Sequence, residues 1–194
     1  MIPLSIRLKF RNILEPLARA LSAGRVSPNT LTLVGLLPAI AAGMAFAGGM
    51  VRLGGVLVGV SGLFDLLDGL VARVANRQTD FGALLDSTLD RFAEIAVFIG
   101  LAILFRETVT LYGVILALGG SLMVSYVRAR AEGLGFRCDS GMLQRPERLI
   151  IVLLGALLGL RFLTWAIWII AVLANVTAIE RLVRVRARMR AAGQ

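Results

Sequence analysis

The sequence contains no histidine and only one cysteine, Cys138, among its 194 residues. A single cysteine excludes an intrachain disulfide. Zinc and other soft-metal sites lack their usual nitrogen and sulfur ligands, so any metal site must use oxygen. Charged residues (17%) and aromatic residues (7%) are also scarce, whereas 58% of the residues are hydrophobic and the mean hydropathy is +0.84. These values indicate a single membrane domain rather than a soluble protein.

Basic residues outnumber acidic residues by 21 to 12. Nucleic-acid-binding proteins show such an excess, but the hydropathy and the scarcity of aromatic residues favour membrane lipid headgroups and phosphorylated substrates as partners. We therefore expect no nucleic acid partner. We also expect no signal peptide, because the first 24 residues alternate charged and apolar positions and lack a clean apolar run before a cleavage site.

Four aspartates, Asp65, Asp68, Asp86 and Asp90, stand in an otherwise apolar part of the chain. Ionisable residues at membrane depth are expensive, which indicates a functional site. The first two are three residues apart and the last two are four apart, so each pair projects from one face of a helix. Two helices joined by the short polar link 76–80 would run antiparallel and could direct both pairs at one point. Carboxylate oxygens suit Mg²⁺ or Mn²⁺.

Two glycines and an arginine accompany the aspartates. Gly69 and Gly82 remove side chains beside the acids, as expected where a bulky ligand approaches the backbone. Arg73, one turn beyond Gly69, is placed to meet a phosphate. The alternative is a polar helix pair packed for stability, in which Asp65 caps a helix or pairs with Arg73. A membrane core gains little from unpaired acids, which favours the ligand-binding interpretation.

Apolar segments of spanning length predict an all-α, polytopic membrane protein with six transmembrane helices. A tight hairpin at 159–162 separates the last two segments. The predicted spans cover approximately 27–47, 54–74, 81–105, 109–130, a segment beginning at 149, and 163–183. Residues 3–23 predict an amphipathic helix on the membrane surface, or one docked on the base of the protein itself. We accordingly divide the chain into an N-terminal amphipathic segment, 1–26, and a membrane domain, 27–194.

The basic residues predict how the spans are oriented. Of the 21 lysines and arginines, only Arg52, Arg106 and Arg161 fall on the side of the membrane opposite to both termini. The positive-inside rule then places both termini, and the aspartates near them, on the cytoplasmic side of the cell membrane. A water-soluble substrate could reach the site from there. The C-terminal sequence VRVRARMR is interpreted as a topological anchor that binds acidic lipid.

The aspartates belong to a longer pattern, Asp65-x-x-Asp68-Gly69-x-x-Ala72-Arg73, then eight residues, then Gly82-x-x-x-Asp86-x-x-x-Asp90. This pattern resembles the complete signature of the CDP-alcohol phosphotransferases, also called phosphatidyltransferases. The resemblance implies an enzyme in which an alcohol hydroxyl attacks the phosphate of a CDP-alcohol and CMP departs. It also implies homodimers.

Residue roles follow from the same resemblance. Two Mg²⁺ or Mn²⁺ ions would be held by the first three aspartates, while Asp90 accepts the hydroxyl proton and also touches metal. The CDP-lipid contacts implied are Asn29, Thr30, Gly69, Arg73, Thr79 and Gly82. Judged from its residue type and position alone, Asn29 would instead belong to the start of a helix, next to Pro28 in the first turn.

Arginines near the cytoplasmic ends of the later spans point to an acceptor that carries its own phosphate, because arginine suits bidentate phosphate recognition. Arg128 and Arg130 fall on different helix faces, and Arg128, one turn from Ser125, is favoured. The predicted acceptor-phosphate contacts are Ser125, Arg128, Arg145 and Arg148. The alternative is that these are positive-inside charges touching lipid headgroups.

The acceptor itself is predicted from finer similarity. The segments LDSTLDR, ARAE and RPERL resemble the phosphatidylinositol phosphate synthases of actinobacteria and their archaeal counterparts. Family members that use glycerol phosphate more often have Pro and Lys where Ser87 and Arg91 stand here. The inositol phosphate enzymes usually have Lys at Arg128 and Glu at Gln144.

We therefore expect transfer from CDP-diacylglycerol to inositol 1-phosphate, with glycerol 3-phosphate as the alternative acceptor. Outside this reaction class, the alternatives are a cation transporter or a scaffold that binds CDP-lipid without turnover. The glycines, Ala72 and Arg73 of the signature count against transport, which does not need them.

Overall fold

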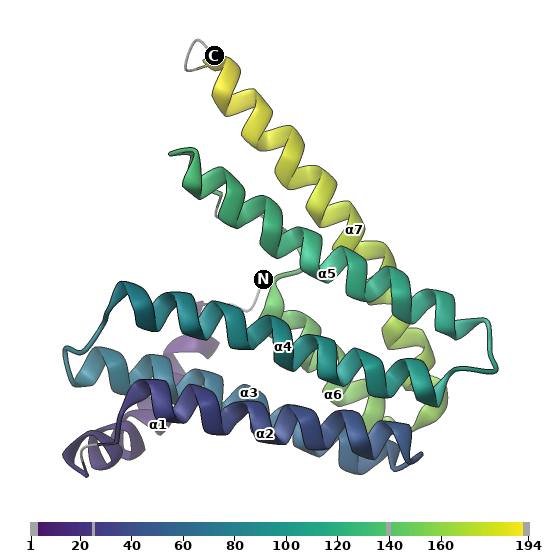
Figure 1. The fold of residues 1–194 in the computed structure, drawn as a ribbon, viewed down its shortest axis with the longest axis horizontal. Helices are drawn as coiled ribbons and strands as arrows, with labels where there is room; N and C mark the ends of the chain where they lie inside the picture. The colour runs from purple at the N-terminus through teal and green to yellow at the C-terminus, as the bar shows by residue number, and fades with distance from the viewer. Residues whose placement is uncertain (1–3, 25, 139–140, 192–194) are drawn as a thin grey trace.

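The computed structural model describes residues 4–24, 26–138 and 141–191, and the side chains from residue 13 onward within these ranges (Figure 1). The first three residues of the predicted N-terminal segment lie outside the described residues. Within these ranges the chain forms helices and no strands, so the all-α prediction is confirmed. The helices are α1 (Leu4–Ala23), α2 (Pro28–Ala47), α3 (Val51–Val74), α4 (Asp80–Leu104), α5 (Thr110–Gly133), α6 (Arg145–Leu158) and α7 (Leu160–Ala191).

Four of the described helices, α2, α3, α5 and α7, are long and apolar enough to cross a membrane. The other two helices of the predicted membrane domain differ from them for physical reasons. Helix α4 has 25 residues but carries Asp86, Asp90, Arg91 and Glu94 within its first 15 residues. Helix α6 has 14 residues and is therefore about 21 Å long, shorter than a bilayer core of about 30 Å. Length and composition thus give four candidate spans where the sequence pattern predicted six.

The predicted hairpin near residue 159 is tighter than expected. Helix α6 ends at Leu158 and α7 begins at Leu160, so the turn is confined to Gly159, whose φ is 112°. Glycine occupies this left-handed region without the strain that a side chain would cause. Helix α7 then continues to Ala191, beyond the predicted end at residue 183. This extension runs beside the end of α5 (Figure 1), where Val185 is buried with Ala131 and Cys138.

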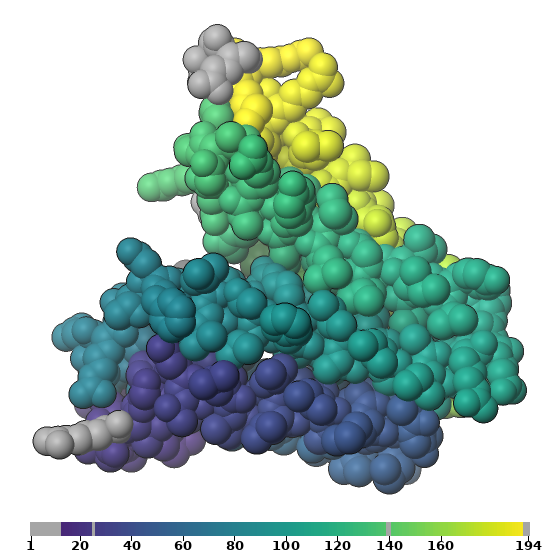
Figure 2. Space-filling view, viewed as in Figure 1, coloured from purple at the N-terminus to yellow at the C-terminus, as the bar shows by residue number. Residues whose placement is uncertain are grey.

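The helices form two packed groups. Helix α2 packs against α3 and α4, helix α5 packs against α7, and α6 joins the groups by contacting both α3 and α7. The α5–α7 pair diverges from α4 toward the C-terminal end (Figure 1), and the molecular surface is hollowed between α4 and α5 there (Figure 2). The main core includes Phe46, Leu101, Leu163, Ile167 and Ile170.

Helix α1 docks on the start of α2 and the end of α3. Ala18 is fully buried in a small cluster with Leu31, Leu70 and Val71. Ile13 and Leu17 on the same helix remain exposed. The described part of α1 therefore packs one apolar side against the protein, while other apolar side chains of the helix stay exposed.

Glycines allow the helix backbones to approach closely. A Cβ on Gly100 of α4 would lie 2.0 Å from the carbonyl oxygen of Gly43 on α2, and a Cβ on Gly43 would lie 2.3 Å from the carbonyl oxygen of Ala96. Similar contacts join α3 to α6 at Gly55 and α6 to α7 at Gly155. Small residues at such interfaces are typical of helices that associate in membranes, where close packing drives association.

Gly100→Ala should weaken the α2–α4 interface, because the new methyl group meets backbone that cannot rotate away. We expect a loss of about 1–3 kcal/mol in the free energy of unfolding, the usual range for overpacking. Gly119→Ala on α5 is the matched control, since a Cβ there has no neighbour within 4 Å. Thermal unfolding in detergent measures both, and equal melting temperatures for the two variants would contradict the prediction.

Candidate active site and metal centre

The four signature aspartates come from two neighbouring helices, Asp65 and Asp68 from α3 and Asp86 and Asp90 from α4. As the spacing predicted, the structure brings acids of both pairs together. Asp65, Asp68 and Asp86 each offer a carboxylate oxygen, and these oxygens all lie within 4.8 Å of one another. The cluster lies toward the ends of α3 and α4 that flank the link between them.

Two oxygens of this cluster have no partner among the described residues. Asp68 Oδ2 and Asp86 Oδ1 are buried and accept no hydrogen bond. Burying a carboxylate oxygen without a partner is costly. A divalent cation that prefers oxygen ligands would satisfy both atoms, so the residues present fit Mg²⁺ or Mn²⁺.

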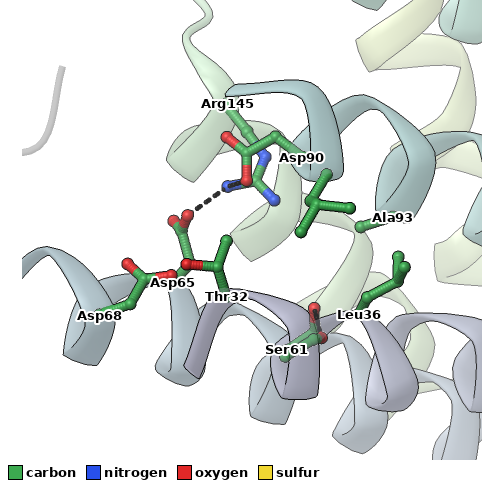
Figure 3. Close-up of a pocket in the computed structure, with 10 residues that line it drawn as sticks. Thr32, Leu36, Ser61, Asp65, Asp68, Asp90, Ala93 and Arg145 are labelled. Carbon is green, nitrogen blue, oxygen red and sulfur yellow. Dashed lines mark hydrogen bonds and ion pairs between the residues drawn. The ribbon is translucent and has the colours of Figure 1, made fainter. Parts of the chain in front are cut away.

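Arg145, at the first position of α6, reaches into the aspartate site. Its Nη1 lies 2.8 Å from Asp65 Oδ1 and 2.8 Å from Asp90 Oδ1 (Figure 3). The sequence pattern assigned Arg145 to the acceptor phosphate and did not foresee this bridge. The alternative pairing of Asp65 with Arg73 is not what the structure has, since the recorded partner of Asp65 is Arg145. Asp90 is thereby held by an arginine beside the three-carboxylate cluster.

A small pocket opens beside these groups, between α2, α3, α4 and α6 (Figure 3). Thr32 lies beside Asp65 and Asp68 (Figure 3). The sequence pattern predicted Asn29 and Thr30 of the same segment as CDP-lipid contacts and did not include Thr32. The signal was helical periodicity, because residues 29 and 32 share a helix face and residue 30 does not. The pocket is lined by Thr32, Gly35, Leu36, Ser61, Asp65, Asp68, Leu89, Asp90, Ala93 and Arg145.

Three of the predicted CDP-lipid contacts lie together although they come from separate segments. Thr79 caps α4 by accepting a hydrogen bond from the Gly82 backbone nitrogen at 3.0 Å. A Cβ on Gly82 would lie 3.0 Å from Thr79 Oγ1 and 3.3 Å from Asn29 Oδ1. Thr30 is exposed in the first turn of α2.

Gly69 is not required by the packing of the chain. A Cβ there would meet only the end of the Arg73 side chain, at 3.7 Å, and Arg73 itself is exposed. The helix could accommodate an alanine at this position without a clash. An open backbone beside an arginine, next to the acids, is the arrangement expected where a phosphate approaches.

The predicted acceptor residues lie in different environments. Arg128 is exposed and pairs with Glu132, Nε to Oε1 at 2.8 Å. Ser125 Oγ donates to the Ser121 carbonyl oxygen at 3.4 Å. Arg148 is buried and pairs with Glu94, Nε to Oε1 at 2.9 Å and Nη2 to Oε2 at 3.3 Å.

The sequence analysis missed Arg181 as a candidate. It is 3% exposed, and its Nη1 donates to the Val124 carbonyl oxygen at 2.6 Å, next to Ser125 in the chain. The sequence pattern placed Arg181 only among the basic residues on the side of the termini. The overlooked signal is the run from Thr177 to Arg181, where one helical turn joins a buried threonine to the arginine on a single face.

Asp86→Asn should weaken binding of a divalent cation, because it removes one ionised ligand of the three-carboxylate cluster. We expect at least about a tenfold loss of Mn²⁺ affinity, comparable with the loss of a supporting group at a metal site. Titration followed by the electron paramagnetic resonance signal of free Mn²⁺ measures it. Glu107→Gln is the control, because Glu107 is exposed in the α4–α5 link. Unchanged affinity in Asp86→Asn would contradict the assignment.

Comparison with curated proteins finds close relatives over nearly the whole chain. The chain is 40% identical over 190 residues to a phosphatidylinositol phosphate synthase of Mycobacteroides abscessus, covering 93% of this chain and 86% of the relative. It is 41% identical over 184 residues to an archaetidylinositol phosphate synthase of Methanothermobacter thermautotrophicus, covering 93% and 92%. Both similarities extend far beyond the aspartate signature.

Solved structures agree with the sequence relatives. The phosphatidylinositol phosphate synthase of Mycobacterium tuberculosis with CDP-DAG bound has a TM-score of 0.82 and 36% identity, covering 90% of this chain and 94% of that one. The same enzyme with manganese and citrate gives a TM-score of 0.80 at 36% identity, covering 88% and 87%. The family model of the CDP-alcohol phosphatidyltransferases matches residues 25–179, which include every aspartate of the site. The chain therefore belongs to the CDP-alcohol phosphatidyltransferase family, and it is a transferase of phospholipid synthesis.

Proposed function

We propose that the protein transfers the phosphatidyl group of CDP-diacylglycerol to a hydroxyl of inositol 1-phosphate, giving phosphatidylinositol phosphate and CMP. The observation that carries the proposal is the cluster of Asp65, Asp68 and Asp86 beside the Arg145–Asp90 pair. Two kinds of relative, a bacterial phosphatidylinositol phosphate synthase and an archaeal archaetidylinositol phosphate synthase, are each about 40% identical to this chain. A related structure holds CDP-DAG and another holds manganese.

The reaction needs negative charge to be neutralised on the pyrophosphate and a base near the attacking oxygen. Asp65, Asp68 and Asp86, with Asp90 at the edge, would hold two Mg²⁺ or Mn²⁺ ions, which when bound supply the charge neutralisation. The acceptor oxygen forms a bond to the lipid-linked phosphorus as the bond from that phosphorus to the CMP oxygen breaks. The hydroxyl proton passes to a carboxylate oxygen of Asp90, whose Oδ1 forms an ion pair with Arg145.

The CDP-lipid would lie against the start of α2 and the facing ends of α3 and α4. Gly69 and Gly82 leave the backbone open there, and Arg73 offers its guanidinium to a phosphate. Asn29, Thr30 and Thr79 would supply polar contacts to the nucleotide. The adjacency of Asn29, Thr79 and Gly82 supports this placement.

The acceptor would enter from the side of α5, α6 and α7. Ser125, Arg128 and Arg148 are proposed to bind its phosphate, with Arg145 closest to the reacting groups. Arg145 Nε is buried and has no acceptor among the described residues, so it offers a donor to a substrate oxygen. Several guanidinium groups in one region favour an acceptor that carries a phosphate over a neutral alcohol.

We also propose that all six helices from α2 to α7 cross the cell membrane, with both termini and the active site cytoplasmic. Arg52, Arg106 and Arg161 stand at the opposite ends of these helices, where basic residues are scarce. Helix α1 would lie on the membrane surface, since Ile13 and Leu17 are exposed beside its docked face. The homodimer implied by the family resemblance stays a prediction.

The purified protein should release CMP from CDP-diacylglycerol only when inositol 1-phosphate and Mg²⁺ or Mn²⁺ are both present. Chelation should abolish the release, and Asp90→Asn should lower kcat by about 10²–10⁴-fold through loss of the base. Radiolabelled CMP release, with inositol 1-phosphate, glycerol 3-phosphate and free inositol supplied separately, measures this. Glu107→Gln serves as the control. Turnover with glycerol 3-phosphate alone would replace the proposed acceptor, and turnover with free inositol alone would refute phosphate recognition.

Single cysteines should report the proposed topology once Cys138 has been changed to alanine. In right-side-out vesicles, a membrane-impermeant maleimide should label Arg106→Cys and Arg161→Cys but not Arg77→Cys. All three positions are exposed. If α4 did not cross the membrane, Arg77→Cys and Arg106→Cys would be labelled alike, which would contradict the six-span arrangement. Labelling of all three after permeabilisation is the control for reactivity.

A further inference from the structure

A second buried ionic group lies next to the active site and is not part of the aspartate signature. Glu94, one turn beyond Asp90 on α4, pairs with Arg148 on α6. The two side chains are 6% and 3% exposed. Their contact is bidentate, with Nε and Nη2 of the guanidinium each on one carboxylate oxygen. Arg148 Nη1 also lies 3.4 Å from the Leu143 carbonyl oxygen.

One side of this pair is apolar. A small cavity next to it is lined by Val58, Val97, Phe98, Leu149 and Val152. A buried ion pair gains little over well-packed apolar side chains of similar volume, because desolvation offsets the attraction. Stability alone is therefore a weak reason for placing a glutamate and an arginine here.

The direction of the Arg148 guanidinium gives a better reason. Glu94 engages the Nε–Nη2 edge and so fixes the plane of the group. The Leu143 carbonyl oxygen lies 3.4 Å from Arg148 Nη1, and the Leu143 backbone nitrogen donates to Thr177 Oγ1, one turn before Arg181 on α7. Each of the three arginines of this region has a partner that holds its guanidinium in place. Arg128 is anchored by Glu132, Arg181 by the Val124 carbonyl oxygen and Arg148 by Glu94.

We propose that Glu94 is a positioning residue for acceptor recognition, which holds the Arg148 guanidinium in the orientation that binds the phosphate of the acceptor. The inference rests on the proposed function, because it requires a phosphorylated acceptor. It adds a residue of α4 that touches neither the metal nor the substrate. Helix α4 would thus serve the metal through Asp86 and the acceptor through Glu94.

Two substitutions separate positioning from simple charge compensation. Glu94→Gln removes the negative charge and leaves more net positive charge near the acceptor phosphate. If Glu94 only neutralised Arg148, this variant would bind the acceptor more tightly. Glu94→Asp keeps the charge but is one methylene shorter, so the bidentate contact is lost. Positioning predicts weaker acceptor binding in both variants.

The experiment is steady-state kinetics of CMP release with each substrate varied in turn. We expect both variants to raise KM for inositol 1-phosphate by about tenfold or more, the effect of losing one charged hydrogen bond. KM for CDP-diacylglycerol and the Mn²⁺ affinity should stay unchanged. Inhibition by inorganic phosphate should weaken in parallel, since the phosphate group alone is the ligand of Arg148.

Val152→Ala is the matched control, because Val152 lines the same cavity without joining the ion pair. It should lower the melting temperature without separating the two KM values. If Glu94→Gln does not fold, Glu94→Asp carries the test. Equal changes in both KM values, or a lower KM for inositol 1-phosphate in Glu94→Gln, would overturn the inference while the proposed function stands. A wild-type protein that uses only an unphosphorylated alcohol would overturn both.

Discussion

Carboxylates inside an apolar helical bundle must be matched by cations, and the arrangement of α3, α4 and α6 follows from that requirement. Arg145 supplies one positive charge to Asp65 and Asp90 from the first turn of α6. Asp68 Oδ2 and Asp86 Oδ1 receive no hydrogen bond from the described residues. Arg91 adds a second contact, with its Nη1 3.7 Å from Asp90 Oδ2. Two guanidinium groups do not balance four carboxylates, so the site favours additional positive charge. Cation binding and the proposed substrate chemistry would therefore meet at the same atoms.

Glycines in this chain serve two different purposes, and their surroundings distinguish them. Gly43, Gly100 and Gly155 lie where any Cβ would overlap a neighbouring helix, so the fold itself requires them. Gly69 lies where a Cβ would meet only the flexible end of Arg73. Packing does not explain that glycine, and an approaching ligand does. The sequence alone cannot separate the two classes, because both occur in apolar helices.

The sequence predicted the features that depend on residues close together in the chain. Helical periodicity and apolar length gave the helices, and the spacing of Asp65, Asp68 and Asp86 gave their convergence. Length and composition identify four of the described helices as spans, because α4 carries charges and α6 has only 14 residues; the other two predicted spans stay a prediction. Contacts between distant segments were not predictable. Arg145 with Asp65 and Arg148 with Glu94 join residues that only the packing of α6 brings together.

Helix α6 is the shortest described helix, yet its first turn links the two halves of the proposed reaction. Arg145 and Arg148 are three residues apart and therefore face the same side. They contact Asp90 and Glu94, which are four residues apart on α4. A rotation of α6 about its axis would move both arginines together. Asp90 stays in place on α4 in such a rotation, so the register between α4 and α6 would set where both arginines lie relative to the proposed base.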